Sequence, residues 1–262
     1  MIPFFINRIY KTMTSLSILF LLLAATTAVA FPNNVIRMLK PHSDSDSNLD
    51  CLSWRLGVET NNVRDWILPA SCGDYVGRYM LGKQYDKDCN IVAKEAYEYA
   101  KTINVAKDGK DTWIFDVDET ALSNLPFFSQ ESAAFGAVPN ATAFYSWIME
   151  GAAPEIPASL WLYKRLLKLG FKIVFLTGSD ESMLEPRIKN LKAVGYSTWE
   201  KLIVRYDGEG GTAVEYKSNR RDKLVADGYR IRGNVGDQWS DLVGSNIGDR
   251  TFKMPNPMYY AP

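Results

Sequence analysis

Histidine is almost missing from the sequence. The 262-residue chain contains a single histidine, His42, which lies in a polar stretch near the N-terminus. A Ser-His-Asp triad, a histidine nucleophile, a zinc site built from histidines and a dinuclear phosphatase site with several histidines all require this residue. Because we expect His42 to be solvated, the sequence argues against all four kinds of site.

An excess of charge is lacking as well, since 30 lysines and arginines balance 30 aspartates and glutamates. This balance gives no support for nucleic acid or an acidic surface as a partner. The phosphate-binding pattern G-x-x-x-x-G-K-[ST] does not occur, and we interpret Gly208 to Gly211 as a loop. Apolar residues make up 47% of the chain, which is typical of one globular domain with a sizeable core.

Long apolar runs are absent except near the N-terminus. There, Arg8 and Lys11 precede the run from Leu16 to Ala25, and the small residues Ala28-Val29-Ala30 follow it. This order is typical of a cleaved secretory signal peptide. The run has about half of the roughly 20 residues that a membrane-spanning helix needs. We therefore expect residues 1–30 to be removed and the mature protein to have no membrane anchor.

The mature chain is expected to begin with a linker or propeptide at residues 31–50, which are polar, rich in serine and aspartate, and without periodicity. One ordered domain is predicted for residues 51–262. Its only sequon, Asn140-Ala141-Thr142, predicts a glycan if the asparagine is exposed.

Cysteine is scarce, with three residues at positions 51, 72 and 89. In a secreted chain, three cysteines allow one disulfide in any of three pairings, and all three can also be buried thiols. We predict a bond between Cys51 and Cys72, because Cys89 lies in a segment with helical periodicity.

Apolar periodicity predicts helices and strands that alternate along the chain. The predicted strands are residues 112–115, 172–176, 202–204 and 231–235, and the predicted helices are 85–104, 157–169, 181–194 and 216–226. Such alternation favours parallel pairing with right-handed crossovers. The predicted fold class is therefore α/β, a Rossmann-like parallel sheet with helices on both faces.

One interval, residues 121–157, interrupts this rhythm. It is too long for a strand-to-helix loop and is rich in aromatic residues, namely Phe127, Phe128, Phe135, Phe144, Tyr145 and Trp147. We predict a small, mainly helical cap over a ligand crevice. The alternative is that these rings only pack against the body of the domain.

Polar residues follow three of the four predicted strands. They are Asp116-Val117-Asp118 with Glu119 beside them, Thr177-Gly178-Ser179-Asp180, and Gly236-Asp237 with Asp241 further on. In parallel sheets the carboxyl ends of the strands meet at one edge, where ligands bind. Any one aspartate can simply cap a helix. Several carboxylates at one edge repel one another unless a cation lies between them, and oxygen ligands favour Mg²⁺.

These residues also carry a resemblance to a family. The pattern D-x-D-x-T at Asp116, Asp118 and Thr120, then Thr177, Lys217 and the segment GDQWSD resemble the four motifs of the haloacid dehalogenase superfamily. The segments CLSWRLGVETNN, YMLGKQYDKD and NVGDQWSDLVG resemble the plant acid phosphatases and vegetative storage proteins of that superfamily.

The resemblance implies catalytic roles for the two aspartates. Asp116 would be the nucleophile that forms an aspartyl-phosphate, and Asp118 the general acid and then the base. Thr177, Gly178 and Lys217 would bind the phosphoryl group. Arg220, Arg221 and Lys223 are close to the lysine along the chain, so the alternative for this run is a charged helix face.

The resemblance likewise implies that Mg²⁺ is held by Asp116, the backbone carbonyl of Asp118 and Asp237, with Asp241 behind them. We expect Glu119 to be a supporting or solvent-facing acid. The substrate would be a small phosphomonoester. The family's storage members further suggest a homodimer, for which the residues indicate no interface.

Two functions remain open at this point. The first is a secreted, Mg²⁺-dependent acid phosphatase, and the second is a storage protein that serves as a nitrogen reserve with vestigial activity. The retained Asp116 favours the enzyme. A dehalogenase is disfavoured because a departing halide needs no acid, which would leave Asp118 without a role. Asn34-Val35-Ile36-Arg37 differs by one residue from the plant vacuolar signal N-P-I-R, so both vacuole and cell wall or extracellular space are candidate destinations.

Overall fold

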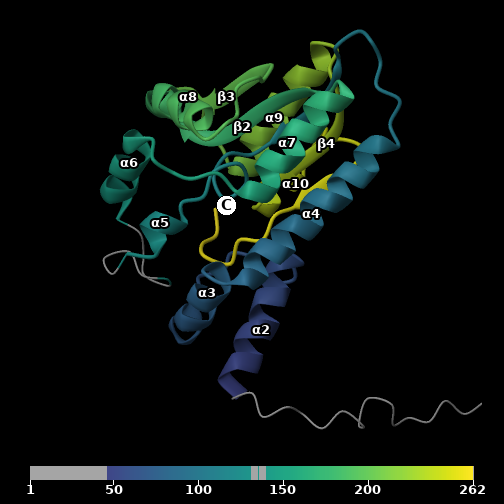
Figure 1. Cartoon of the computed structure of the whole chain (residues 1–262). Coiled ribbons are helices and arrows are strands. Elements are labelled where there is room, and N and C mark those ends of the chain that lie inside the picture. Colours follow the sequence, from purple (N-terminus) through teal and green to yellow (C-terminus); the bar gives the residue numbers. More distant parts are fainter. Residues whose placement is uncertain (1–45, 131–134, 136–139, 262) are drawn as a thin grey trace, which may run out of the picture. The chain divides into compact units, whose positions relative to one another are not determined.

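The computed structural model describes residues 46–130, 135 and 140–261 (Figure 1). The predicted signal peptide and most of the predicted linker lie outside the described residues. Helix α2 (Asp46–Glu59) begins five residues before Cys51, where we expected ordered structure to start. Cys51 is buried one turn inside this helix, whereas residues 48–50 before it are exposed.

A five-stranded parallel sheet forms the centre of the domain, in the order β3-β2-β1-β4-β5. Its strands are β1 (Asp111–Phe115), β2 (Lys172–Asp180), β3 (Lys201–Arg205), β4 (Arg230–Gly236) and β5 (Thr251–Lys253). The central position of β1 places its carboxyl end between those of β2 and β4, where Phe115 pairs with Phe175 and Val235. The predicted parallel α/β sheet is confirmed.

Helices cover both faces of the sheet because alternate residues of β1 enter two separate hydrophobic clusters. Trp113 and Phe115 belong to one cluster and Ile114 to the other. On the first face, α4 (Lys83–Lys101) and α7 (Pro157–Leu169) run side by side (Figure 1). On the other face, α9 (Ala213–Ala226) contacts β2 and β4. Burial on both faces explains the continuous apolar runs of β1 and β2.

The helices before β1 are tied together by a disulfide. It joins Cys51 of α2 to Cys72 in the short helix η2 (Ala70–Cys72), which leads into α3 (Gly73–Met80). Cys89 lies in α4 as a buried free thiol. This is the pairing expected from the sequence.

Two short helices occupy the interval expected to form a cap. They are α5 (Leu125–Phe128) and α6 (Ala141–Glu150). The rings of Phe127 and Phe144 meet at 5.3 Å, and Phe128 stacks on Tyr259 of the C-terminal segment at 5.0 Å. The cap is thus helical, and its aromatic rings pack both on one another and on the body of the domain. Asn140 is exposed, and its side chain accepts hydrogen bonds from the first turn of α6.

The boundaries of three predicted helices were wrong. The helix expected over residues 85–104 is α4, which begins at Lys83 and ends at Lys101. The helix expected over residues 181–194 is divided into η4 (Glu181–Met183) and α8 (Leu184–Ala193), with Asp180 capping the first turn and Pro186 tolerated at the start of α8. Helix α9 begins three residues before the expected Tyr216, because Thr212 and Glu215 form a reciprocal capping box. Among the described residues, no helix combines the length and apolarity needed to cross a membrane.

Candidate active site

The chain reverses direction immediately after β1, and this turn separates the two aspartates of the first motif. Asp116 still pairs with the sheet through its N–H, which donates to the Val235 carbonyl at 2.9 Å. Glu119 adopts a left-handed conformation with φ of 49°, which is uncommon for a residue with a side chain. As a result Asp116 is buried, whereas the Asp118 side chain keeps 23% of its surface exposed.

Three buried acids gather at the carboxyl ends of β1 and β4. Asp116, Asp237 and Asp241 can each present an oxygen within 4.8 Å of the others. Lys217 of α9 donates to Asp116 Oδ1 at 2.7 Å and to Asp241 Oδ1. A hard divalent cation fits this donor set, because it consists of buried carboxylate oxygens.

The charges of this cluster do not balance. Burial raises the pKa of Asp116 well above its ordinary value, although Lys217 works against this. Burial and the neighbouring Asp241 raise the pKa of Asp237 to about 6. Burial alone would lower the pKa of Lys217, but the Asp116 and Asp241 carboxylates outweigh it and raise this pKa above its ordinary value. The lysine therefore stays charged, and one cation serves three acids, which favours binding of a second cation.

Asp118 points to a different set of partners. Arg187 Nη2 lies 2.6 Å from both Asp118 oxygens, and Asn124 Nδ2 donates to Asp118 Oδ1 at 2.8 Å. Arg187 belongs to α8, is 2% exposed, and also donates to Ser179 Oγ. The Asp118 carboxylate is thus held apart from the three clustered acids, which leaves only its backbone carbonyl for the predicted metal role.

The end of β2 supplies the predicted phosphate-binding residues. Thr177 is buried, and its Oγ1 accepts a hydrogen bond from the Ser179 N–H at 3.1 Å. Gly178 is exposed, and a Cβ on it would point into open space. Together with Lys217 these residues line a cavity of about 540 Å³ that also contains Asp116, Asp118 and Asp237.

The cavity is bordered by the cap and by the C-terminal segment. Phe144 of α6 and Tyr259 both line it. Asp241 lies behind the cavity, in the short helix α10 (Trp239–Leu242), where its Oδ2 accepts the Gln238 N–H at 2.9 Å. It approaches so closely that a side chain at Gly236 would collide with it.

Neighbouring polar residues fix the orientation of Asp237. Thr120 Oγ1 donates to Asp237 Oδ1 at 3.1 Å, and Asn256 Nδ2 donates to Oδ2 at 2.8 Å. Gln238 Nε2 donates to the same Oδ2 at 2.9 Å. Such hydrogen bonds hold a metal-binding carboxylate in one rotamer.

Glu119 is a supporting acid and does not face solvent, contrary to one of the two expectations. It is fully buried, and its Oε1 accepts the Asn124 N–H at 2.6 Å. The Asn124 Oδ1 in turn accepts a hydrogen bond from Trp147 Nε1 of the cap at 2.9 Å. Asn124 therefore links helix α6 to both Asp118 and Glu119.

The structure also distinguishes Lys217 from the basic residues near it in sequence. Arg221 is fully buried and donates to the carbonyls of Asp241 and Val243, so it supports the backbone behind the site. Arg220 pairs with Glu209 instead. Lys217 is thus the basic residue of this run that contacts the acids.

Comparison with known proteins gives a consistent result. A family model described as HAD superfamily, subfamily IIIB (acid phosphatase) matches residues 37–262. Acid phosphatase 1 of Solanum lycopersicum is 47% identical, over 84% of this chain and 87% of that protein. Vegetative storage protein 1 of Arabidopsis thaliana is 41% identical, over 87% of this chain and 85% of that protein.

A solved structure supports the same fold. The class C acid phosphatase from Bacillus anthracis, determined with tungstate bound, superposes with a TM-score of 0.57. The match covers 71% of this chain and 84% of that chain, at 21% sequence identity.

Proposed function

The chain belongs to the acid phosphatases of subfamily IIIB of the haloacid dehalogenase superfamily, and we propose that it hydrolyses small phosphomonoesters through an aspartyl-phosphate on Asp116. The observation that carries this proposal is the buried group of Asp116, Asp237 and Asp241 around Lys217, at the floor of a cavity. Among the described residues that line the cavity, no other nucleophile lies next to both a charged lysine and a candidate metal site.

In the first step, a carboxylate oxygen of Asp116 attacks phosphorus and the bond to the ester oxygen breaks. Asp118, held by Arg187 and Asn124, gives a proton to the departing alcohol. The Thr177 hydroxyl and the Gly178 N–H hydrogen-bond the transferring oxygens. Lys217 compensates their negative charge and favours the ionised form of Asp116.

In the second step, water attacks the phosphorus of the aspartyl-phosphate. Asp118 accepts a proton from this water, so that it returns to its starting state as Asp116 is released and inorganic phosphate leaves. The same side chain thus acts as acid in one step and as base in the other. Its partial exposure allows it to reach both the alcohol and the water.

Mg²⁺ is the proposed cofactor, and when bound it would reduce the repulsion between the Asp116 carboxylate and the phosphate. Asp116, Asp237 and the backbone carbonyl of Asp118 would hold the ion. Asp241 would lie behind these ligands and add negative charge near the ion. The clustered carboxylate oxygens and the fixed rotamer of Asp237 support this assignment.

A storage role is the second candidate, favoured by the similarity to vegetative storage proteins 1 and 2 of Arabidopsis thaliana. The presence of Asp116 in an assembled site favours the enzyme. We also propose a cleaved signal at residues 1–30, a short linker after it, and export to the vacuole or the extracellular space. The exposed Asn140 is the proposed glycan site.

The proposal is tested with a panel of phosphomonoesters assayed with and without Mg²⁺. Chelation is expected to abolish turnover and Mg²⁺ to restore it, while full activity in excess chelator would contradict the metal site. Asp116→Asn should remove turnover of every ester. Asp207→Asn is the matched control, because Asp207 is exposed and outside the cavity.

A further inference from the structure

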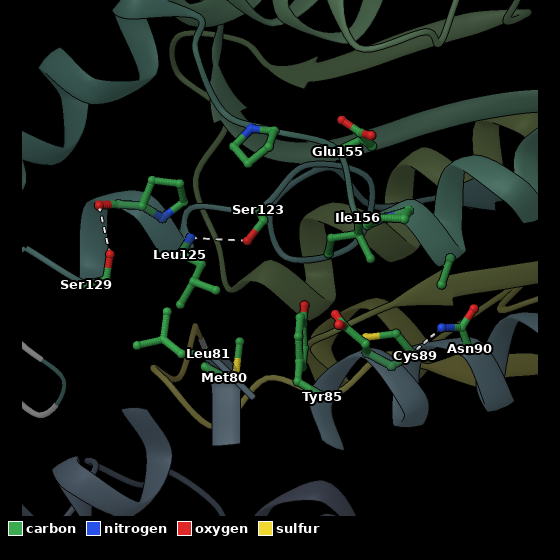
Figure 2. A pocket seen from close by; sticks show the side chains of 15 residues that line it. Met80, Leu81, Tyr85, Cys89, Asn90, Ser123, Leu125, Ser129, Glu155 and Ile156 are labelled. Atoms are coloured by element: carbon green, nitrogen blue, oxygen red, sulfur yellow. Dashed lines mark hydrogen bonds between the residues drawn. The ribbon is translucent and has the colours of Figure 1, made fainter. Parts of the chain in front are cut away.

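A second cavity, also of about 540 Å³, shares no lining residue with the cavity at the acid cluster. It lies between the end of α3, the first half of α4, α5 and the segment 154–158 that enters α7 (Figure 2). Its volume is within the range of small-molecule sites, which is about 300–1,000 Å³. It is therefore large enough for an organic ligand.

The walls of this second cavity are mainly apolar. Met80, Leu81, Leu125 and Ile156 line it together with three prolines and Ala158. Ser123 Oγ accepts the Leu125 N–H at 3.2 Å, so this polar wall atom already has a partner (Figure 2). A ligand that fills the cavity would bury apolar surface and remove it from water.

One polar group in the cavity lacks a strong hydrogen-bond partner among the described residues. Tyr85 is 5% exposed, and its hydroxyl has no well-aligned hydrogen bond with the residues that the structure describes, although the Cys89 thiol, a weak hydrogen-bonding group, lies beside it. Figure 2 shows this hydroxyl pointing from α4 into the cavity. Buried hydroxyls in folded proteins are nearly always hydrogen-bonded, so this one indicates a missing acceptor.

The hydroxyl acts as a donor here. Burial, together with Cys89 and the charge of Glu119, raises the pKa of Tyr85 well above its ordinary value. It therefore keeps its proton at neutral pH and needs an acceptor oxygen or nitrogen on the ligand.

Charge at the rim decides against an anionic ligand. Asp86 and Glu155 are the charged residues that line the cavity, and no lysine or arginine of the described residues lines it. A phosphate ester or a carboxylate would meet two negative charges there without a compensating cation. This cavity is thus unsuited to a second substrate molecule.

We propose that the second cavity is a binding site for an uncharged, mainly apolar small molecule that accepts one hydrogen bond from the Tyr85 hydroxyl. The site is independent of the phosphatase chemistry. It lies beside Asn124, however, because Ser123 and Leu125 both line it and flank that residue in sequence.

Three probes of similar size test the three parts of this proposal. Benzylacetone carries a carbonyl acceptor, butylbenzene lacks it, and phenylbutyrate adds a negative charge. Binding to the purified protein is measured by chemical-shift titration. We expect saturable binding of benzylacetone, with butylbenzene about threefold to tenfold weaker because it gains no hydrogen bond from the hydroxyl, and phenylbutyrate weaker than the ketone.

Variants locate the binding to this cavity. Tyr85→Phe should remove the preference for benzylacetone over butylbenzene while butylbenzene still binds. Leu81→Glu should weaken both probes, and Leu56→Glu is its matched control, because Leu56 is equally exposed, at 63% against 66%, and lies outside the cavity. Absence of saturable ketone binding, an unchanged preference in Tyr85→Phe, or equal effects of the two leucine variants would each overturn the proposal. Phosphate release is not a readout, so a failed phosphatase assay leaves this test intact.

Discussion

Replacement of Lys217 by methionine should make the stability of the protein depend more strongly on Mg²⁺. Lys217 is buried between Asp116 and Asp241, and no other salt bridge reaches the three clustered acids in the part of the chain that the structure describes. Methionine fills a similar volume without the charge. The variant therefore leaves three buried acids without a salt-bridge partner among the described residues.

The expected loss follows from the burial of these groups. Breaking a buried ion pair by removing one partner costs about 3–5 kcal/mol of unfolding free energy. A loss of 1 kcal/mol lowers Tm by about 2–4 °C in a domain of this size, so Tm in chelator should fall by roughly 6–20 °C. Mg²⁺ at one hundred times its Kd would return about 2.7 kcal/mol, since it binds only the folded state.

Thermal unfolding in chelator and in excess Mg²⁺ measures both effects. Lys201→Met is the control, because Lys201 forms an exposed pair with Asp227, and such pairs contribute at most about 1 kcal/mol. Mg²⁺ should stabilise Lys217→Met more than the wild-type protein, since the lysine no longer competes for the carboxylates. A fall in Tm for Lys217→Met no larger than that for Lys201→Met would refute this prediction. So would a rise in Tm with Mg²⁺ that is no larger for Lys217→Met than for the wild-type protein.

Three further predictions concern other parts of the chain. Asp118→Asn should slow the first step of alkyl phosphate hydrolysis about 10²–10⁴-fold. The same step should be spared for p-nitrophenyl phosphate, because its phenolate leaves without a proton. Stopped-flow bursts of equal size for both esters would contradict this prediction. Asp111 accepts a hydrogen bond from Arg230, which holds the pKa of this carboxyl well below its usual range. Asp111→Asn should therefore destabilise the protein at pH 7. The difference in unfolding free energy between variant and wild type, measured by urea unfolding, should shrink as pH falls below about 4. Non-reducing peptide mapping should find Cys51 joined to Cys72, and a bond to Cys89 would contradict the pairing.

The main strands of the fold could be predicted because they are buried on both faces. Residues Trp113 to Phe115 and the matching run in β2 are continuously apolar, which is the pattern of a parallel sheet, whereas β4 alternates apolar Ile231 and Val235 with polar residues and glycine. Strand β5 was missed because it has three residues and only Phe252 is buried. Its pairing with β4 depends on tertiary contact rather than on a local pattern.

The acids of the site could be predicted because chemistry places them at strand ends. Arg187 and Asn124 were missed for a different reason. Arg187 meets Asp118 across 69 residues of sequence, and a single arginine on a helix of mixed charge usually faces solvent. Asn124 contacts Asp118 only because the left-handed Glu119 turns the chain back on itself. Neither contact leaves a signal in local periodicity.

The most direct test of the proposed mechanism is to find the phosphoryl group on the protein. Asp118→Asn lacks the base for the second step, so brief reaction with p-nitrophenyl phosphate in Mg²⁺ followed by acid quenching should trap the intermediate. Peptide mass spectrometry is expected to place one phosphoryl group on Asp116 and to find none in the Asp116→Asn, Asp118→Asn double variant. A phosphoryl group on another residue, or turnover by Asp116→Asn at the wild-type rate, would contradict the account.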